Sequence, residues 1–249
     1  MKKIIITGAS GNIGTEITKY FYNKYHLICL DKNLKTLKIL KKKYPKIEIY
    51  KLDLNNLKNL SAVIKKITRK NKKIDILINN AGKIFSNPII RFKNGKIEKH
   101  SFKDWEEIIK TNLTSAFNIS SYLIENMVSN RNPGLIINIS SIASEGNEGQ
   151  SAYSAAKAGI NALTFTWAKE LSRFNIRVAG ISPGFFSTES TYQSINKSYI
   201  EHIKKNTPSK RLGKISELIQ GIDFIIKNKF FNGKILKIDG GLKILKKNH

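Results

Sequence analysis

Apolar runs and helical spacings alternate along the chain. Seven short runs rich in Ile, Leu and Val have the length of strands, and they lie at residues 3–7, 26–30, 47–52, 74–78, 135–140, 176–181 and 234–238. Between them apolar residues recur every three or four positions, as at Ile13, Ile17 and Phe21, which indicates amphipathic helices. This alternation predicts parallel strands joined by right-handed crossovers. We therefore expect an α/β fold in which helices cover both faces of a doubly wound, seven-stranded parallel sheet.

One segment, residues 88–100, interrupts the alternation. Asn94-Gly95 lies there between two short runs, and this dipeptide favours the tight turn of a hairpin. We interpret the segment as an insertion near the mouth of a site. A plain surface loop is the alternative, because Lys and Arg dilute the strand pattern on both sides of the turn.

Length and composition suit one folded unit. The chain has 249 residues, of which 41% are hydrophobic and 9% aromatic, so it can bury a sizeable core. We find no linker or repeat, and one domain over residues 1–249 is expected. The first apolar run breaks at Gly8, too early for a signal peptide, and no run approaches the roughly 18 residues that span a bilayer. With Cys29 as its one cysteine, the protein is expected in the cytoplasm, without a membrane partner.

The formal net charge of +26 raises nucleic acid as a partner. The lysines, however, occur in helix after helix and accompany abundant Asn and Ile, which indicates a bias of the whole sequence more than one focused patch. We therefore expect no nucleic-acid partner. Attraction of acidic cofactors and substrates is a plausible by-product of the charge.

A glycine-rich turn follows the first predicted strand and leads into a helix. Its candidate cofactor-binding residues are Gly8, Ser10, Gly11, Asn12, Ile13 and Gly14. Glycines permit a tight turn, close approach of a pyrophosphate, and close packing of helix on strand, while the helix N-terminus offers free N–H groups. Phosphate binding is the natural use, although glycine also serves strand-to-helix turns that bind nothing.

Polar residues also follow the next three strands. Asp31 can accept hydrogen bonds from both hydroxyls of an adenine ribose and would repel a 2′-phosphate, which favours NAD(H) over NADP(H). Lys32 and Lys35 soften that repulsion, so NADP(H) stays open. Asp31 and Asp53 are alternatively helix caps. The remaining candidates at this edge, where open parallel sheets bind ligands, are Leu54, Asn80, Ala81 and Gly82.

Tyr153 and Lys157 are spaced by one helical turn in the predicted helix over residues 151–173. That spacing places both side chains on one face. A nearby ammonium favours the phenolate form and would move the tyrosine pKa from about 10 toward the working range. The pair is therefore a candidate for proton transfer, and a partly buried Tyr beside a solvated Lys is the alternative.

Together these motifs resemble the short-chain dehydrogenase/reductase family, in its common single-domain, Rossmann-type form, over nearly the whole chain. The resemblance rests on ITGASGNIG, NNAG, KTNLTSAF, INISSIAS, YSAAK, SPGFFST and NGKILKIDGG. It implies an NAD(P)-dependent oxidoreductase that moves a hydride between nicotinamide and a carbonyl or secondary alcohol, without a metal. A homo-oligomer, tetramer or dimer, is implied as well, with its main contact on the helices over residues 102–127 and 151–173.

The resemblance also implies individual roles. Tyr153 is the acid/base, Lys157 its partner and a ligand of the nicotinamide ribose, and Ser141 holds the substrate oxygen, with Ser140 as the less favoured choice. Asn112 would hold a water that links Lys157 to solvent. Pro183, Gly184 and Thr188 would contact the nicotinamide. Two departures stand out: twelve positions separate Ser141 from Tyr153, one fewer than is usual, and Asn12 replaces a glycine of the turn.

The substrate is less defined than the chemistry. The C-terminal half is similar to short-chain 3-hydroxyacyl-CoA and hydroxysteroid dehydrogenases, which suggests a small-molecule or acyl-thioester substrate. Other members reduce 3-oxoacyl groups on acyl carrier protein or oxidise sugars and polyols, and a non-catalytic dinucleotide sensor is a further alternative. We expect residues 185–211 to form a lid, with candidate contacts at Phe185, Phe186, Tyr192 and Tyr199.

Overall fold

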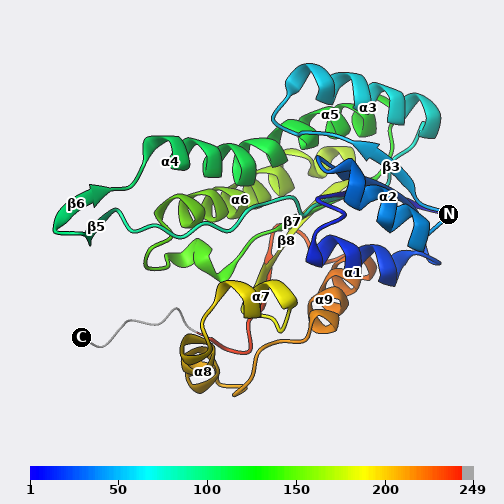
Figure 1. The fold of residues 1–249 in the computed structure, drawn as a ribbon. Helices are drawn as coiled ribbons and strands as arrows, with labels where there is room; N and C mark the ends of the chain where they lie inside the picture. Colours follow the sequence, from blue (N-terminus) through cyan, green and yellow to red (C-terminus); the bar gives the residue numbers. More distant parts are fainter. Residues whose placement is uncertain (243–249) are drawn as a thin grey trace.

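The computed structural model describes residues 1–242, apart from the side chains of Ser190 and Ser194. It contains one parallel sheet in the order β3-β2-β1-β4-β7-β8-β9 (Figure 1). Its strands are β1 (Lys3–Thr7), β2 (His26–Asp31), β3 (Glu48–Lys51), β4 (Ile76–Asn79), β7 (Gly134–Ile139), β8 (Ile176–Pro183) and β9 (Ile235–Ile238). The chain winds outward from β1 to β3, and then outward from β4 to β9 on the other side. The predicted doubly wound, seven-stranded fold is confirmed.

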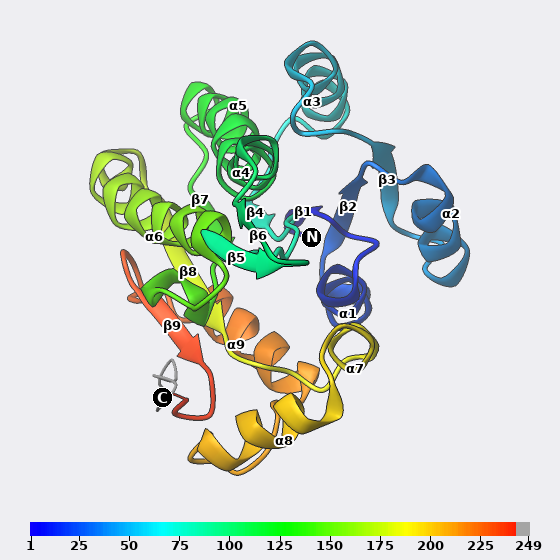
Figure 2. The same ribbon diagram turned by 60° about the vertical axis from the view of Figure 1, so that its left-hand side comes forward.

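Helices cover both faces of the sheet (Figure 2). Ile4 and Ile6 of β1 point to one face, where they pack with α1 (Asn12–Phe21), α2 (Leu34–Lys43) and α9 (Ile215–Lys227). Ile5 points to the other face, toward α3 (Leu57–Asn71), α5 (Ser115–Ser129) and α6 (Ser151–Glu170). Alternate residues of one strand therefore enter two separate cores, which explains why central strands such as β1 and β4 are almost continuously apolar and do not alternate in polarity.

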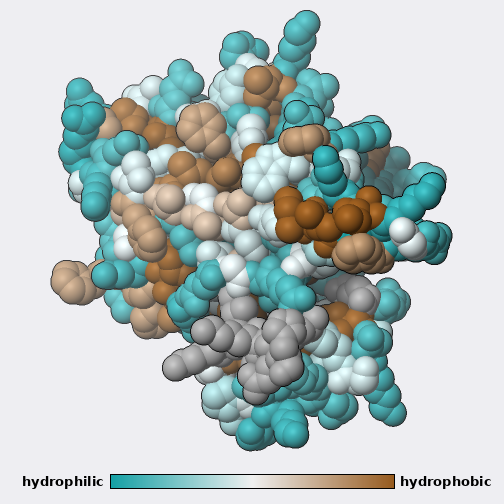
Figure 3. Space-filling view, turned by 90° about the vertical axis from the view of Figure 1, so that its left-hand side faces the viewer, coloured by the Kyte–Doolittle hydropathy of each residue, from teal (hydrophilic) through white to brown (hydrophobic). Residues whose placement is uncertain are grey.

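The segment that interrupts the alternation forms a hairpin of β5 (Ile90–Lys93) and β6 (Lys96–Lys99). Asn94 and Gly95 both have positive φ, 51° and 73°, as a tight two-residue hairpin turn requires. The hairpin projects from the body at the left of Figure 1, and Figure 3 shows that face, where apolar surface lies among hydrophilic side chains. Phe92 is 80% exposed there.

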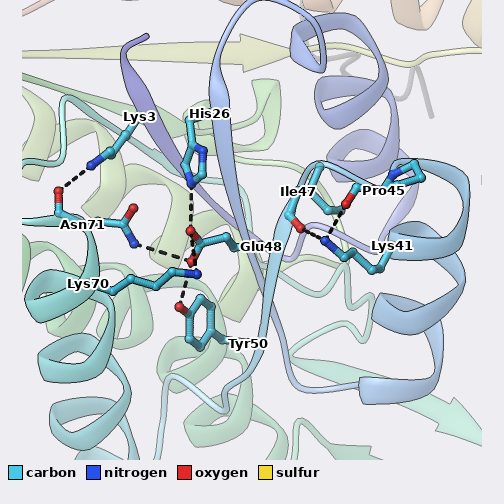
Figure 4. Close-up of polar contacts among 9 residues, drawn as sticks. All are labelled: Lys3, His26, Lys41, Pro45, Ile47, Glu48, Tyr50, Lys70 and Asn71. Carbon is cyan, nitrogen blue, oxygen red and sulfur yellow. Dashed lines mark hydrogen bonds and ion pairs between the residues drawn. The ribbon is translucent and has the colours of Figure 1, made fainter.

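A polar cluster ties strands at the amino ends of the sheet (Figure 4). The Glu48 carboxylate at the start of β3 accepts hydrogen bonds from Tyr50 at 2.8 Å and from Lys70 at 3.1 Å, and it lies 2.9 Å from Nε2 of His26 in β2. Burial alone would raise the pKa of Glu48, but these partners outweigh it and lower that pKa to about 2. The cluster therefore joins β2, β3 and α3 at the edge opposite the carboxyl ends.

The remaining helices are α4 (Phe102–Ile109), α7 (Glu189–Ser194) and α8 (Lys197–Asn206). The helix expected over residues 102–127 is widened by a π-helical turn at Lys110–Thr114, which divides it into α4 and α5. Such turns occur frequently at functional sites. No helix within residues 1–242 is both long enough and apolar enough to cross a membrane.

Candidate active site

A cavity of about 1500 Å³ opens at the carboxyl ends of the strands. It brings together predicted residues that are far apart in the sequence. Those on its lining are Gly8, Gly11, Asn12, Ile13, Asp31, Asp53, Leu54, Asn80, Ala81, Gly82, Asn112, Ser141, Tyr153, Lys157, Pro183, Gly184 and Thr188. Ser10 and Gly14 are not on the lining. The cavity is thus continuous from the glycine turn to the Tyr153 hydroxyl.

The glycine turn is closed by backbone contacts. Gly8 has φ +61°, and a Cβ there would lie 2.9 Å from Cα of Ala81. A Cβ on Gly14 would lie 2.2 Å from the Gly8 oxygen, so Gly14 serves the packing of α1 against the turn. The Ser10 hydroxyl instead meets Thr36 of α2 at 2.7 Å. The N-cap of α1 is Gly11, which has no side chain to accept a hydrogen bond from the first turn. Within the described residues, the N–H groups of that turn therefore have no side-chain cap, and Gly11, Asn12 and Ile13 are on the cavity lining.

Two side chains join the glycine turn to the turn after β4. The Thr7 hydroxyl accepts hydrogen bonds from the backbone N–H groups of Asn80 and Ala81, each at 3.0 Å. The Asn80 amide donates to the oxygens of Thr7 and Gly8, at 3.0 and 3.1 Å. Sequence reasoning missed Thr7, although its place as the last residue of β1, directly before Gly8, was a usable signal. These bonds hold the two turns as one unit.

Asp31 ends β2 and faces the cavity, and its carboxylate is held by the backbone. Oδ2 accepts from the Ser10 N–H at 3.2 Å, and Oδ1 accepts from the Asn33 N–H at 3.0 Å. The cap of α2 is Asn33, whose side chain accepts from the N–H groups of Lys35 and Thr36. Asn56 likewise caps α3. Neither Asp31 nor Asp53 is therefore a helix cap, which removes the structural alternative for both.

Tyr153 and Lys157 lie on the same face of α6, and both are buried. Nζ of Lys157 donates to the oxygen of Ile139 at 2.8 Å and lies 5.7 Å from the centre of the Tyr153 ring. Burial lowers the pKa of Lys157 to about 8. Burial also raises the pKa of Tyr153, and the hydrogen bond with Ser141 only partly opposes the rise. The expectation that Lys157 would lower the tyrosine pKa is thus wrong for this arrangement, because burial outweighs the hydrogen bond with Ser141 and raises that pKa.

The two serines after β7 differ in where their hydroxyls point. Ser140 donates to the backbone oxygen of Lys157 at 3.4 Å and is buried. Ser141 hydrogen-bonds the Tyr153 side chain and accepts from the Ala143 N–H at 3.1 Å. Of the two hydroxyls, only that of Ser141 meets the tyrosine, so the geometry favours the choice of Ser141 over Ser140.

Asn112 sits in the π-helical turn between α4 and α5. Its Oδ1 accepts from the N–H of Lys83 at 3.0 Å, and its Nδ2 donates to the oxygens of Lys83 and Ile108, both at 3.0 Å. A Cβ on Gly82 would lie 2.7 Å from Oδ1 of Asn112 and 3.6 Å from Nζ of Lys157. The Asn112 side chain is therefore occupied in holding the turn after β4, close to the Lys157 ammonium.

A buried polar chain fixes the elements that carry these residues. Asn79 of β4 donates to Ser120 of α5 at 2.9 Å and to Asn138 of β7 at 2.8 Å. Asn138 in turn donates to Thr164 of α6 at 2.9 Å. The side chains of both strands thus bond to helices on one face, and α6 is held two turns beyond Lys157.

Beyond Tyr153 the cavity has a mixed lining. Apolar contacts come from Phe85, Ile142, Phe185, Phe186, Ile195 and Tyr199. Gln150 bonds Ser86 at 2.9 Å and accepts from Asn147 at 3.0 Å, which gives this end a polar wall. Of the aromatic residues expected in the lid, Tyr192 is not on the lining; its hydroxyl lies 3.0 Å from that of Ser187.

The adenine end offers groups that fit a dinucleotide. The uncapped N–H groups of α1 suit phosphate, and the Asp31 carboxylate suits a ribose. Oδ1 of Asn55, on the same lining, is buried and lacks a hydrogen-bond partner among the described residues. These donors and acceptors could hold a nicotinamide dinucleotide.

The comparisons with known proteins agree with this geometry. The family model of short chain dehydrogenases matches residues 2–198. A 3-oxoacyl-(acyl-carrier-protein) reductase from Thermotoga maritima is 34% identical over 98% of both chains. Two solved structures, each 28% identical, are similar throughout: 4-hydroxyisoleucine dehydrogenase complexed with NADH, with a TM-score of 0.84 over 99% of this chain and 100% of that one, and ElxO with NADP bound, with a TM-score of 0.85 over 96% and 98%. The chain therefore belongs to the short-chain dehydrogenase/reductase family and is an oxidoreductase that uses a nicotinamide dinucleotide.

Proposed function

We propose that Tyr153 is the acid/base of hydride transfer between the nicotinamide and a carbonyl or secondary alcohol, assisted by Ser141, Lys157 and Asn112. The observation that carries the proposal is the meeting of the Tyr153 and Ser141 side chains on the cavity, with the Lys157 ammonium one helical turn away. The two hydroxyls can bind one substrate oxygen together, which fixes the carbon to be reduced.

The pKa values suit reduction at neutral pH. The bound cofactor supplies the hydride to the carbonyl carbon. Tyr153, kept protonated by its raised pKa, gives its proton to the carbonyl oxygen, and Ser141 donates a hydrogen bond to that oxygen. Lys157, with a pKa of about 8, is mostly cationic at pH 7 and stabilises the phenolate that remains. Oxidation of the alcohol runs the same proton transfer backwards.

We propose NAD(H) as the preferred cofactor, held by the glycine turn, Asp31, Asp53, Leu54 and the residues 80–82, with Pro183, Gly184 and Thr188 at the nicotinamide. Asp31 supports this choice, because a carboxylate on the lining repels a 2′-phosphate. Lys32 is on the lining as well, so use of NADP(H) is the alternative.

For the substrate we propose a 3-oxoacyl or 3-hydroxyacyl thioester. The Thermotoga relative is named as a 3-oxoacyl-(acyl-carrier-protein) reductase, and the apolar side chains beyond Tyr153 suit an acyl chain. A sugar acid or polyol is the second candidate, because Asn147, Gln150 and Ser86 give the same end a polar wall.

A homo-oligomer in the cytoplasm completes the proposal. Phe117 of α5 and Phe165 of α6 are 49% and 43% exposed, on two helices that were expected to carry the contact between subunits. Aromatic side chains are enriched at interfaces between protein chains, which supports a contact at these two helices.

The test follows oxidation of NADH or NADPH by absorbance, with 3-oxoacyl thioesters, ketosteroids and keto sugars as substrates. We expect turnover with a thioester and NADH. Replacing Tyr153→Phe should lower kcat by about 10²- to 10⁴-fold, the usual contribution of a positioned acid, and leave the Kd of NADH unchanged. Full activity in Tyr153→Phe would exclude the proposed acid, and tight NADH binding without turnover of any substrate would favour a sensor.

A further inference from the structure

Lys83, the residue after the Gly82 turn, forms an ion pair on the wall of the cavity. Its Nζ lies 2.7 Å from Oε1 of Glu107 in α4, and both residues are on the cavity lining. The Lys83 side chain is 51% exposed and that of Glu107 is 49% exposed. An ion pair this open contributes little to folding, so its partners can exchange at small cost.

The backbone of Lys83, in contrast, is fixed. Asn112 accepts from the Lys83 N–H and donates to the Lys83 oxygen, both at 3.0 Å. Two residues earlier, Ala81 packs against Gly8, and the Asn80 amide donates to the Gly8 oxygen at 3.1 Å. The backbone of Lys83 is therefore anchored by Asn112, in the turn whose earlier residues Asn80 and Ala81 contact Gly8, and its exposed side chain can change partners.

Glu107 is an anion among cations. The hydrogen bond and charge of Lys83 lower the pKa of Glu107, and the charges of Lys32 and Lys103 add to this effect. Lys32 comes from the loop after β2 and is itself on the lining, as is Lys110 of the π-helical turn. Cations from three separate segments therefore line the cavity, and Glu107 is paired with one of them.

We propose that Lys83 is a cofactor-binding residue that exchanges Glu107 for a phosphate of the dinucleotide, and that Glu107 competes with the cofactor for it. The diphosphate carries two negative charges, and the proposed function places them at the glycine turn, which is in contact with Asn80 and Ala81 of the turn that carries Lys83. Glu107 both occupies the ammonium and repels the incoming anion. The inference rests on that placement of the cofactor and adds a phosphate ligand outside the glycine turn.

This competition predicts effects of opposite sign in the two partners. In Lys83→Met the Kd of NADH should rise about three- to tenfold, because a charge-assisted contact is lost. In Glu107→Gln the Kd should fall about two- to fivefold, because the competitor and the repulsion are both removed. If the Lys83–Glu107 ion pair only held the cavity wall in place, both substitutions would weaken NADH binding.

The experiment measures dissociation constants by NADH fluorescence and by calorimetry with ADP-ribose and adenosine. ADP-ribose retains the diphosphate and should follow NADH, whereas adenosine has no phosphate and should bind both variants like the wild type. Raising NaCl to about 0.5 M should shrink the differences, since screening is strong at that ionic strength.

A second ion pair of the same kind supplies the control. Arg91 and Glu98 of the hairpin are 46% and 40% exposed and lie off the cavity lining, so Arg91→Met and Glu98→Gln should leave every Kd unchanged. Weaker binding in Glu107→Gln, or an unchanged Kd in Lys83→Met, would overturn the inference while leaving the proposed function standing. If the wild type bound neither NADH nor ADP-ribose, the proposed function would fall with it.

Discussion

Lys157 reaches from α6 to the last residue of β7, where its ammonium donates a hydrogen bond to the backbone oxygen of Ile139 at 2.8 Å. The side chain is buried, so the protein keeps a cation out of water at the point where proton transfer is proposed. Its pKa of about 8, below the ordinary 10.5, expresses the cost of that burial. Function and stability therefore oppose each other at this residue.

Lys157→Met should stabilise the protein at pH 7 while it abolishes turnover. The folded-state pKa lies below the unfolded one, so the wild type bears the full cost of the buried charge below about pH 8 and loses it as the pH rises toward 10.5. After loss of the hydrogen bond to Ile139, we expect a net gain of about 2 kcal/mol at pH 7. Urea unfolding at several pH values measures this gain in the free energy of unfolding. A gain that did not shrink above pH 8 would contradict its attribution to the buried charge.

Gly14→Ala should damage the turn, whereas Gly11→Ala should not. A Cβ on Gly14 would lie 2.2 Å from the Gly8 oxygen and 2.7 Å from Cα of Ala9, and both obstacles are backbone. We expect a loss of about 3 kcal/mol or more in the free energy of unfolding. At Gly11, with φ −76°, the nearest atom would be 3.4 Å away, so a change within about 0.5 kcal/mol is expected. Equal losses in thermal unfolding would refute the packing argument.

Asp31→Asn should erase the preference for NADH. The amide keeps one oxygen, which can accept from the N–H of Ser10 or of Asn33 but not from both, and it removes the charge that repels a 2′-phosphate. We expect the ratio of the Kd values of NADPH and NADH to fall about tenfold, which corresponds to roughly 1.4 kcal/mol. Lys32→Met is the opposing control, since loss of that cation should weaken NADPH binding. A ratio that stayed fixed in both variants would place the selectivity elsewhere.

Glu48→Gln should make the protein less stable at neutral pH and less sensitive to acid. The folded-state pKa of about 2 lies below the ordinary 4.5, so the carboxylate stabilises the fold above pH 4.5 and loses this effect as the pH falls toward 2. Allowing for partial screening by solvent, we expect the variant to lose about 1–2 kcal/mol at pH 7. In acid titrations followed by circular dichroism, the difference in stability between the wild type and Glu48→Gln should disappear near pH 2. A difference that stayed constant with pH would contradict the role of the Glu48 cluster.

The five central strands were predictable from the sequence because their apolar runs are buried on both faces of the sheet, whereas the edge strands β3 and β9 are only partly buried. The ends of the strands were harder to predict. Ile74 is buried before β4 begins at Ile76, since hydrophobicity reports burial and not ladder pairing. The caps Asn33 and Asn56 were missed in favour of Asp31 and Asp53, because both Asn and Asp can cap a helix and only the geometry decides between them. The assignment of residues 1–249 to one domain stays a prediction, and its last seven residues lie outside the described part.

The place of Tyr153 and Lys157 on one face of a helix was predictable, because their spacing is about one helical turn. Contacts between segments that are distant in the sequence were not predictable. The Lys83–Glu107 pair spans 24 positions, and the π-helical turn that aims Asn112 leaves the apolar periodicity of residues 102–127 almost unchanged. The direction of the Tyr153 pKa was also beyond reach, because it depends on how much solvent the fold removes and not on which residue is four positions away.

The polar chain from Asn79 through Asn138 to Thr164 bears on how this protein can change its substrate over evolutionary time. With Thr164 bonded to one residue of β7 and Lys157 bonded to the next, α6 cannot slide or rotate by a step without breaking both attachments. The Tyr153 hydroxyl, which we propose as the acid/base, therefore keeps its position relative to the sheet. We therefore expect substrate specificity to change through the segments around residues 84–88, 142–150 and 185–199. These segments can vary in length and sequence without displacing Tyr153 or Lys157.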